Sequence, residues 1–294
     1  MDVADYWQVL RQTAVESMAF VIVGPMLLLP FIVAEQLRPV HRRPGWRDYS
    51  INILISASTI FLAMPLGVLI GLATERLRHA LPWESVGFSY DTIAQVPAIG
   101  GMLAVMAMAI VPIVVHDVAF YWAHRIEHRV PFLWEFHKLH HSDELMNCST
   151  WARDHFLQAI WVTVFPALAL GLVFDISAFQ AGQAALLSGL LLSFLSMFYH
   201  SAIRIELPWL DRVVVTPQVY SLHHSCDPQH FNSNFADAFP LLDILFGTYR
   251  KPQGGQFPGT GLGDDYPAPR SLWSAQVLPA LGGFRALTTY GKAR

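Results

Sequence analysis

The chain has 294 residues, of which 53% are hydrophobic and 14% are charged, and its formal net charge at pH 7 is -3. Soluble globular domains carry roughly 25% charged residues, so this composition excludes an ordinary soluble domain and predicts a membrane protein. The slight negative charge excludes a protein that binds nucleic acid through a basic surface. The length predicts one membrane domain, residues 1–294.

Five apolar segments are each long enough to cross a bilayer as a helix. They are residues 18–34, 51–73, 99–121, 156–174 and 178–199. The acidic start MDVADYWQVL lacks the charged leader of a signal peptide, so we expect the first segment to remain as an uncleaved span. The pattern predicts an all-α integral membrane helical bundle of four to five spans, beginning with N-terminal spans in residues 1–115.

The loop between the first two apolar segments sets the expected orientation. It carries four arginines, whereas the longer loop 74–98 carries two. Short basic loops are retained in the cytoplasm, so residues 124–155 and everything after residue 200 are expected at the cytoplasmic face. Both cysteines, Cys148 and Cys226, then lie in the cytoplasm and are expected to stay reduced.

Histidines are concentrated in the middle of the chain: eleven of the thirteen lie between His116 and His230. The motif HRIEH, residues 124–128, places two imidazoles on one face of a helix, and HKLHH, residues 137–141, does the same within one helical turn. The predicted topology brings eight histidines to one membrane face. They are His124, His128, His137, His140, His141, His200, His223 and His224. Eight imidazoles suit iron, zinc or copper and are too many for one ion, so we predict two metal ions.

The segment from Asp117 to Tyr249 resembles the fatty acid hydroxylase and sterol desaturase superfamily of membrane di-iron enzymes. The resemblance rests on DVAFYWAHRIEHRVPFLWEFHKLHHSDELMN, FYHS, TPQVYSLHHS and LLDILFGTY, in the family's order and spacing. It implies a cytosolic helical cap carrying a His-rich dimetal site, within a histidine-box catalytic region at residues 116–250. It also implies two iron ions, which zinc can replace in purified protein, with O2 as co-substrate and a reductase as electron donor.

The resemblance further implies a division of the ligands between the two metals. One metal is expected on His124, His137, His140 and His223, and the other on His128, His141, His200 and His224. The residues expected to orient the imidazoles from a second layer are Asp117, Asn147, His155 and Asn234. Ordinary capping, turn or surface roles stay open for these four. The remaining histidines, His41, His79, His116 and His230, are expected to be structural or to lie away from the metals.

Three positions depart from the family pattern. Tyr220 stands where the third histidine box usually begins with histidine, and it could ligate a metal, donate a hydrogen bond to metal-bound oxygen, or fill space. We include Tyr220 among the catalytic candidates. Gln158 and Leu242 stand where the family often has a carboxylate and a tryptophan, which points to a different substrate.

The predicted function is hydroxylation of a lipid: a fatty acyl chain, a sterol, a carotenoid or a related molecule. Desaturation and carbon–carbon cleavage of an aldehyde remain alternatives at the same site, as does a non-catalytic membrane protein with a structural zinc pair. No flavin, haem or dinucleotide fingerprint is present, so the electrons must come from another protein. Aromatic residues near the interface, among them Phe120 and Trp134, form either a membrane belt or a substrate pocket. Residues 251–294, rich in Gly and Pro, are predicted to be a loop-rich cytosolic tail without chemistry.

Overall fold

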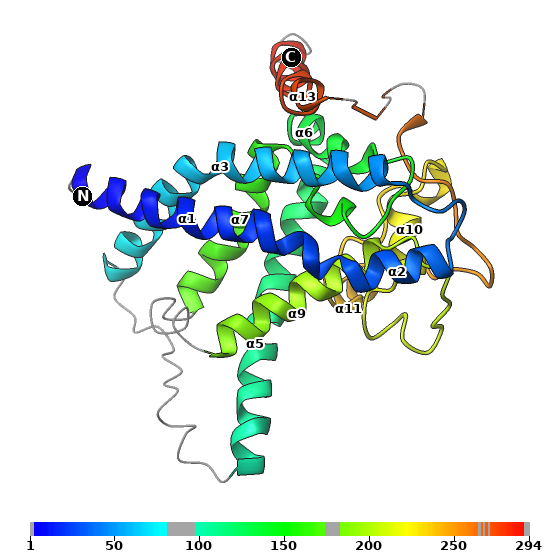
Figure 1. Ribbon diagram of the computed structural model, residues 1–294, viewed down its shortest axis with the longest axis horizontal. Helices are drawn as coiled ribbons and strands as arrows, with labels where there is room; N and C mark the ends of the chain where they lie inside the picture. The colour runs from blue at the N-terminus through cyan, green and yellow to red at the C-terminus, as the bar shows by residue number, and fades with distance from the viewer. Residues whose placement is uncertain are drawn as a thin grey trace.

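The computed structural model describes residues 3–80, 98–173, 183–263, 266, 268–269 and 271–290. Within these ranges the regular structure is helical, with two isolated β-bridges between loops, so the all-α prediction is confirmed. Five long helices form the body of the molecule. They are α1 (Val3–Leu27), α3 (Trp46–Ala80), α5 (Ala98–Glu127), α7 (Phe156–Val173) and α9 (Gln183–His200). Helix α3 packs on α1 and α7, and α5 packs on α7 and α9 (Figure 1).

Among the described residues, two helical stretches are long and apolar enough to cross a membrane, Tyr6–Leu37 and Trp46–Thr74. Two shorter apolar helical stretches accompany them, Phe156–Ala169 and Leu187–His200. The long stretches turn large apolar side chains outward: Val15, for example, is 71% exposed. Such a surface suits hydrocarbon, because apolar side chains gain nothing from facing water. The finer prediction of four to five spans is not tested by these helices, and parts of the third, fourth and fifth predicted segments lie outside the described residues or side chains.

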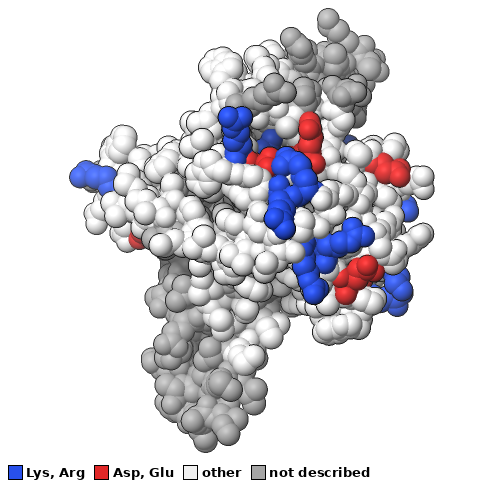
Figure 2. Space-filling view, turned by 45° about the vertical axis from the view of Figure 1, so that its right-hand side comes forward, with Lys and Arg blue, Asp and Glu red and all other residues white. Residues whose placement is uncertain are grey.

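Short helices and loops cover one end of this bundle and form the cap. They are α2 (Leu29–Leu37), α6 (Pro131–His141), η1 (Thr150–Ala152), α10 (Pro217–His223), η2 (Pro228–His230) and α11 (Leu241–Leu245). Figure 2 shows Lys and Arg side chains gathered on this end, whereas most of the described surface of the long helices is uncharged. Polar and apolar regions are therefore separated along the molecule.

Buried carboxylates fasten the cap to the long helices. Glu35, fully buried on α2, accepts hydrogen bonds from the backbone N–H groups of Cys148 and Ala202 and from the hydroxyl of Tyr49. These contacts join α2 and α3 to the loops that follow α6 and α9. Burying a carboxylate is costly unless hydrogen-bond donors replace its lost hydration. Because the loops supply these donors, Glu35 holds them in one position.

The C-terminal tail differs in part from the loop-rich prediction. Residues 251–262 contain no helix, but α12 (Leu272–Gln276) and α13 (Leu278–Tyr290) follow, and α13 packs along α6 (Figure 1). A Cβ atom at Gly283 would lie 2.8 Å from the Phe136 ring, so the absence of a side chain permits the close approach. Gly283 is therefore a packing position within α13.

Candidate metal centre

Four segments bring the eight predicted histidines together. His124 lies in the last turn of α5 and His128 directly follows that helix. The last turn of α6 carries His137, His140 and His141; the end of α9 carries His200, and the end of α10 carries His223 and its C-cap His224. Seven of the eight are buried and His128 is half-buried.

The imidazoles form two groups in which the possible ligand atoms lie within 4.8 Å of one another. The first group consists of His124, His128, His137, His141 and His223, and the second of His140, His200 and His224. The last turn of α6 contributes to both groups, as its spacing predicted. The grouping differs from the division implied by the resemblance in two ways. His140 lies with His200 and His224 instead of with His124, and His128 and His141 lie with His124 instead of with His200.

The ring nitrogens converge closely. Nε2 of His137 lies 3.1 Å from Nε2 of His124 and 3.0 Å from Nε2 of both His128 and His141. In the second group, Nε2 of His200 lies 3.2 Å from Nε2 of His140. Ligand nitrogens about 2.0–2.1 Å from a shared zinc ion, or from a similar ion, necessarily come this close to one another.

The opposite ring nitrogens identify the tautomer. Nδ1 of His124, His200 and His223 lies 2.8 to 2.9 Å from a backbone carbonyl oxygen, so each of these nitrogens carries the proton and donates it. Their Nε2 atoms then carry free lone pairs: those of His124 and His200 face the Nε2 atoms of His137 and His140, and the buried Nε2 of His223 has no hydrogen-bond partner among the described residues. A bound cation in each group would accept these lone pairs, so the residues present fit a metal centre.

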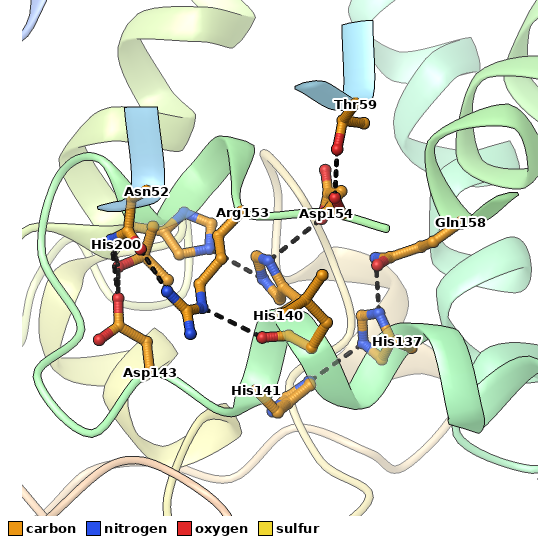
Figure 3. A network of polar contacts seen from close by, with 12 residues as sticks. Asn52, Thr59, His137, His140, His141, Asp143, Arg153, Asp154, Gln158 and His200 are labelled. Atoms are coloured by element: carbon orange, nitrogen blue, oxygen red, sulfur yellow. Dashed lines mark hydrogen bonds and ion pairs between the residues drawn. The ribbon is translucent and has the colours of Figure 1, made fainter. Parts of the chain in front are cut away.

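Two carboxylates that the sequence analysis did not single out, the buried Glu127 and the half-buried Asp154, face two of the remaining ligands. Oε2 of Glu127 lies 3.3 Å from Nδ1 of His137, and Oδ1 of Asp154 lies 3.3 Å from Nδ1 of His140 (Figure 3). Carboxylates commonly hold metal-ligating imidazoles in this way. Glu127 lies inside HRIEH, one residue before His128, and Asp154 precedes His155. A search for acidic neighbours of the histidine boxes would have found both.

Gln158 contacts His137 at the position where the family often has a carboxylate. Its side-chain nitrogen lies 2.7 Å from Nδ1 of His137, while its buried oxygen has no partner. The two ends of an amide have nearly the same shape, and turning this amide directs its oxygen at the Nδ1 proton that a ligating His137 must carry. Gln158 can therefore serve as a neutral acceptor for this ligand.

The segment that carries Asp154 is fixed by a buried arginine. Arg153 donates to the side chain of Asn52, to the carbonyl oxygen of Leu139 and to the hydroxyl of Ser142 (Figure 3). These contacts tie η1 to α3 and α6. Asp154 is thereby held beside His140 by the same turn of α6 that supplies three of the imidazoles.

Burial keeps the imidazoles neutral. It lowers the pKa of His124 to about 4, against hydrogen bonding to the Phe235 carbonyl, which raises it. Burial and the neighbouring imidazoles lower the pKa of His128, His137, His141 and His223 far below the ordinary value. Neutral imidazole is the form that ligates metals.

Two of the residues predicted to orient imidazoles contact backbone instead. Asp117 accepts hydrogen bonds from the N–H groups of residues 237, 238 and 239 at 2.9 to 3.0 Å. Asn234, with φ of 56°, donates to carbonyl oxygens of Val219 and Arg250. Both fasten the loop that supplies the carbonyl acceptors for His124 and His223, so they act on the ligands indirectly.

The other two predicted orienting residues also have structural contacts. Asn147 accepts from the N–H and hydroxyl of Ser149 and forms a turn. His155 contacts the carbonyl oxygen of Gln276 through Nε2, 2.8 Å away, and accepts the N–H of Leu157 through Nδ1. The expected direct contacts with a ligating imidazole are absent for Asn147 and His155 among the described residues.

The remaining histidines lie outside the two groups, as predicted. His116 contacts Asp237 at 3.2 Å, His230 contacts the Ser225 hydroxyl at 2.8 Å, and His41 contacts a carbonyl oxygen of the C-terminal loop. The side chain of His79 is outside the described part of the structure.

Tyr220 packs between Tyr199 and the imidazoles. Its ring centroid lies 4.2 Å from that of Tyr199, 4.7 Å from that of His200 and 5.0 Å from that of His224. Burial raises the pKa of Tyr220 well above its ordinary value, so in this environment it is a neutral phenol. Leu242, the other departure, lies on α11 in the cap.

A cavity of about 240 Å³ adjoins the imidazoles and extends between α5, α7 and α9. Near the histidines its wall is polar, with Glu127, Asp154 and Asp237; farther along α5 and α7 it is apolar, with Phe120 and Val162. The cavity thus connects the metal centre with the apolar helices, which suits a substrate that resides in the bilayer.

Long apolar helices and a buried convergence of imidazoles define the class of helical membrane proteins with a histidine-rich metal centre. Residues 109–248 match the fatty acid hydroxylase family. The matched residues include all of the histidine boxes, in agreement with the resemblance seen in the sequence.

The similar proteins are hydroxylases and monooxygenases. Alkylglycerol monooxygenase from Xenopus tropicalis is 29% identical over 45% of this chain, and ornithine lipid hydroxylase OlsE from Rhizobium tropici is 28% identical over 48%. A cholesterol 25-hydroxylase-like protein from Danio rerio is 25% identical over 75% of this chain and 84% of its own length. The match spans 28% of the alkylglycerol monooxygenase and 41% of OlsE. No solved structure matches the chain.

Proposed function

We propose that the chain is a membrane-bound non-haem di-iron oxygenase that hydroxylates a lipid, using O2 and electrons from a reductase. The convergence of eight imidazoles beside a cavity between the apolar helices carries this proposal. When bound, two iron ions supply the oxidising power for a C–H bond that no side chain can attack. The protein holds the ions, orients the lipid and excludes water.

We assign the ligands by the observed distances. The first ion is held by the group centred on His137, and the second by His140, His200 and His224. Three protein ligands leave positions open, as in catalytic metal sites. Two histidines of each group line the cavity, so a substrate there would lie near both ions, and the smaller group would leave more positions open to it. Glu127 and Asp154 keep His137 and His140 in the ligating tautomer.

The cavity favours a lipid whose reacting part is neutral. It is smaller than the roughly 300–1,000 Å³ pockets that enclose drug-sized ligands, so it fits one segment of a lipid while the rest stays in the bilayer. Its described lining includes three acidic residues and no Lys or Arg, which disfavours a carboxylate or phosphate beside the metals. The relatives are named for alkylglycerol, ornithine lipid and cholesterol, and each offers a neutral hydrocarbon segment.

The basic residues support a cytoplasmic position for the centre. The loop between α2 and α3 carries Arg38, Arg42 and Arg43, Arg47 follows in the first turn of α3, and basic side chains gather on the same end as the cap (Figure 2). Short basic loops stay in the cytoplasm, where soluble reductases are available.

Tyr220 lines the cavity. We assign its hydroxyl the role of a hydrogen-bond donor on the side of the centre that faces the substrate.

The test begins with the metal content of detergent-purified protein, followed by turnover with alkylglycerol, ornithine lipid and cholesterol under labelled O2 and a reduced ferredoxin. Two irons per chain and one labelled oxygen atom in a lipid product are expected, with both lost in His140→Ala and His224→Ala. Asp48→Asn, at the exposed Arg42 pair, is the control that keeps both. Loss of two hydrogens without oxygen gain would favour desaturation, a shortened product would favour aldehyde cleavage, and two irreplaceable zinc ions would favour the structural alternative.

A further inference from the structure

The histidine cluster has two sides. His124, His137, His140 and His200 line the cavity, whereas His128, His141, His223 and His224 do not. Substrate that arrives from the apolar helices therefore meets only half of the ligands. The other side is directed away from the cavity and toward the surface of the cap.

Trp134 covers part of this second side. Its ring centroid lies 5.1 Å from that of His128, 5.5 Å from that of His141 and 5.9 Å from that of His137, so one indole contacts three ligands of the first group. Trp134 is half-buried, and His128 is the one imidazole of the eight that is not fully buried. Arg129 and Val130, which follow His128, are exposed. By the burial of its residues, the metal centre lies nearest to solvent at Trp134 and His128.

The position of Trp134 on α6 is not explained by packing against the rest of the fold. The histidines of α6 face the centre, and Phe136 lies under Gly283 of α13. Trp134 lies on the same face of α6 as His137 and His141, and its indole N–H donates no hydrogen bond to any residue that the structure describes. A buried tryptophan usually finds a partner for this group, so the indole is placed as a half-buried residue whose aromatic contacts are with three of the ligands.

We propose that Trp134 and the adjoining edge of His128 are the point at which electrons enter the metal centre. This inference rests on the proposed function. In each of two encounters, a one-electron donor protein docks beside Trp134, loses one electron and is oxidised, and one iron ion is reduced from ferric to ferrous; no bond of Trp134 forms or breaks. Electron tunnelling falls steeply with distance, so a donor must approach where a conjugated ring touches a ligand. The lipid and the donor then use opposite sides of the cluster and do not compete.

Charge beside this point favours an acidic donor. Arg129 is exposed and directly follows His128, and complementary charge accelerates docking in a salt-dependent way. Reversing this charge perturbs docking without touching the buried ligands.

The experiment follows anaerobic reduction of the iron-loaded ferric protein by stopped-flow absorption, with an acidic reduced [2Fe–2S] ferredoxin or with dithionite. Trp134→Leu is expected to slow reduction by ferredoxin by about tenfold, equivalent to about 1.4 kcal/mol of barrier, at unchanged iron content, whereas Trp134→Phe keeps most of the rate. The matched control is Trp209→Leu, because Trp209 is exposed and has no ring contact with a histidine among the described residues. Arg129→Glu should slow ferredoxin at low salt and leave the dithionite rate unchanged.

Two results would overturn the inference. The first is reduction by ferredoxin at the wild-type rate in both Trp134→Leu and Arg129→Glu. The second is faster reduction of Trp134→Leu by dithionite with no change for ferredoxin, which would show that the indole only excludes water and small reductants. Should Trp134→Leu fail to retain iron, Trp134→Phe and Arg129→Glu decide the matter. A wild-type protein without redox-active iron would instead refute the proposed function. Normal wild-type turnover with unaffected variants would refute only the entry point.

Discussion

Replacing Asp117 tests how the loop at residues 233–239 supports the metal centre. The buried carboxylate accepts three backbone N–H groups, at 2.9, 3.0 and 3.0 Å. Asp117→Ala leaves three donors without a partner, two of them buried and that of Phe239 part-buried. At about 1–3 kcal/mol for each orphaned donor, the loss of stability is about 3–9 kcal/mol. Asp117→Asn keeps one acceptor oxygen and loses about 1–3 kcal/mol, so a graded series is expected.

The assay is the midpoint of thermal unfolding in detergent, measured with and without added iron. The same loop presents the Phe235 and Ser233 carbonyl oxygens to His124 and His223, so weaker metal retention should accompany the lost stability. The control is Asp48→Asn, whose exposed pair with Arg42 is worth at most about 1 kcal/mol. Equal midpoints for Asp117→Ala and the wild type would refute the reasoning.

Three further predictions concern the ligands, the pH and the tail. Glu127→Gln and Asp154→Asn should each weaken metal affinity by about 10–100-fold in competition with a chelator, and unchanged affinity would remove both from the centre. The metal-free protein should lose stability as the pH falls below 6.5, because the imidazoles of the unfolded chain then bind protons and the buried imidazoles of the folded chain do not. His124 alone, with a folded pKa of about 4, accounts for a loss of about 3 kcal/mol. Unfolding midpoints that stay constant between pH 7 and pH 4 would contradict this prediction. Gly283→Val should reduce the free energy of unfolding by about 1–3 kcal/mol, because the added side chain collides with Phe136. Gly67→Ala should leave it unchanged, because a Cβ atom there meets nothing within 4 Å.

The helical class and the histidine set could be predicted from the sequence because both depend on local patterns. Apolar runs identify the long helices, and four-residue spacing places His124 and His128 on one face. Which imidazoles share an ion could not be predicted in this way, because it depends on how α9 and α10 approach the last turn of α6. The structure therefore groups His140 with His200 and His224.

The orienting residues were predicted least well, for a related reason. Asp117 and Asn234 have the right chemistry, but their partners are backbone groups of a distant loop. The carboxylates that do face imidazoles, Glu127 and Asp154, resemble ordinary acidic neighbours in the sequence. Only the fold of η1, fixed by Arg153, brings Asp154 to His140. The helices of the tail were missed because Gly282 and Gly283 suggest a break unless the facing surface of α6 is known.

The ligands come from segments that are far apart in the chain, and this governs when the protein can acquire metal. His124 to His141 lie within one helical hairpin and can meet early in synthesis, but His200, His223 and His224 follow only after the last apolar helix is in place. Asp243, which holds the N–H groups of Phe235 and Ala236, comes later still. The ribosome must therefore synthesise and release the chain well beyond residue 243 before both ions can be held. Metal is then acquired only by a chain whose membrane insertion has finished.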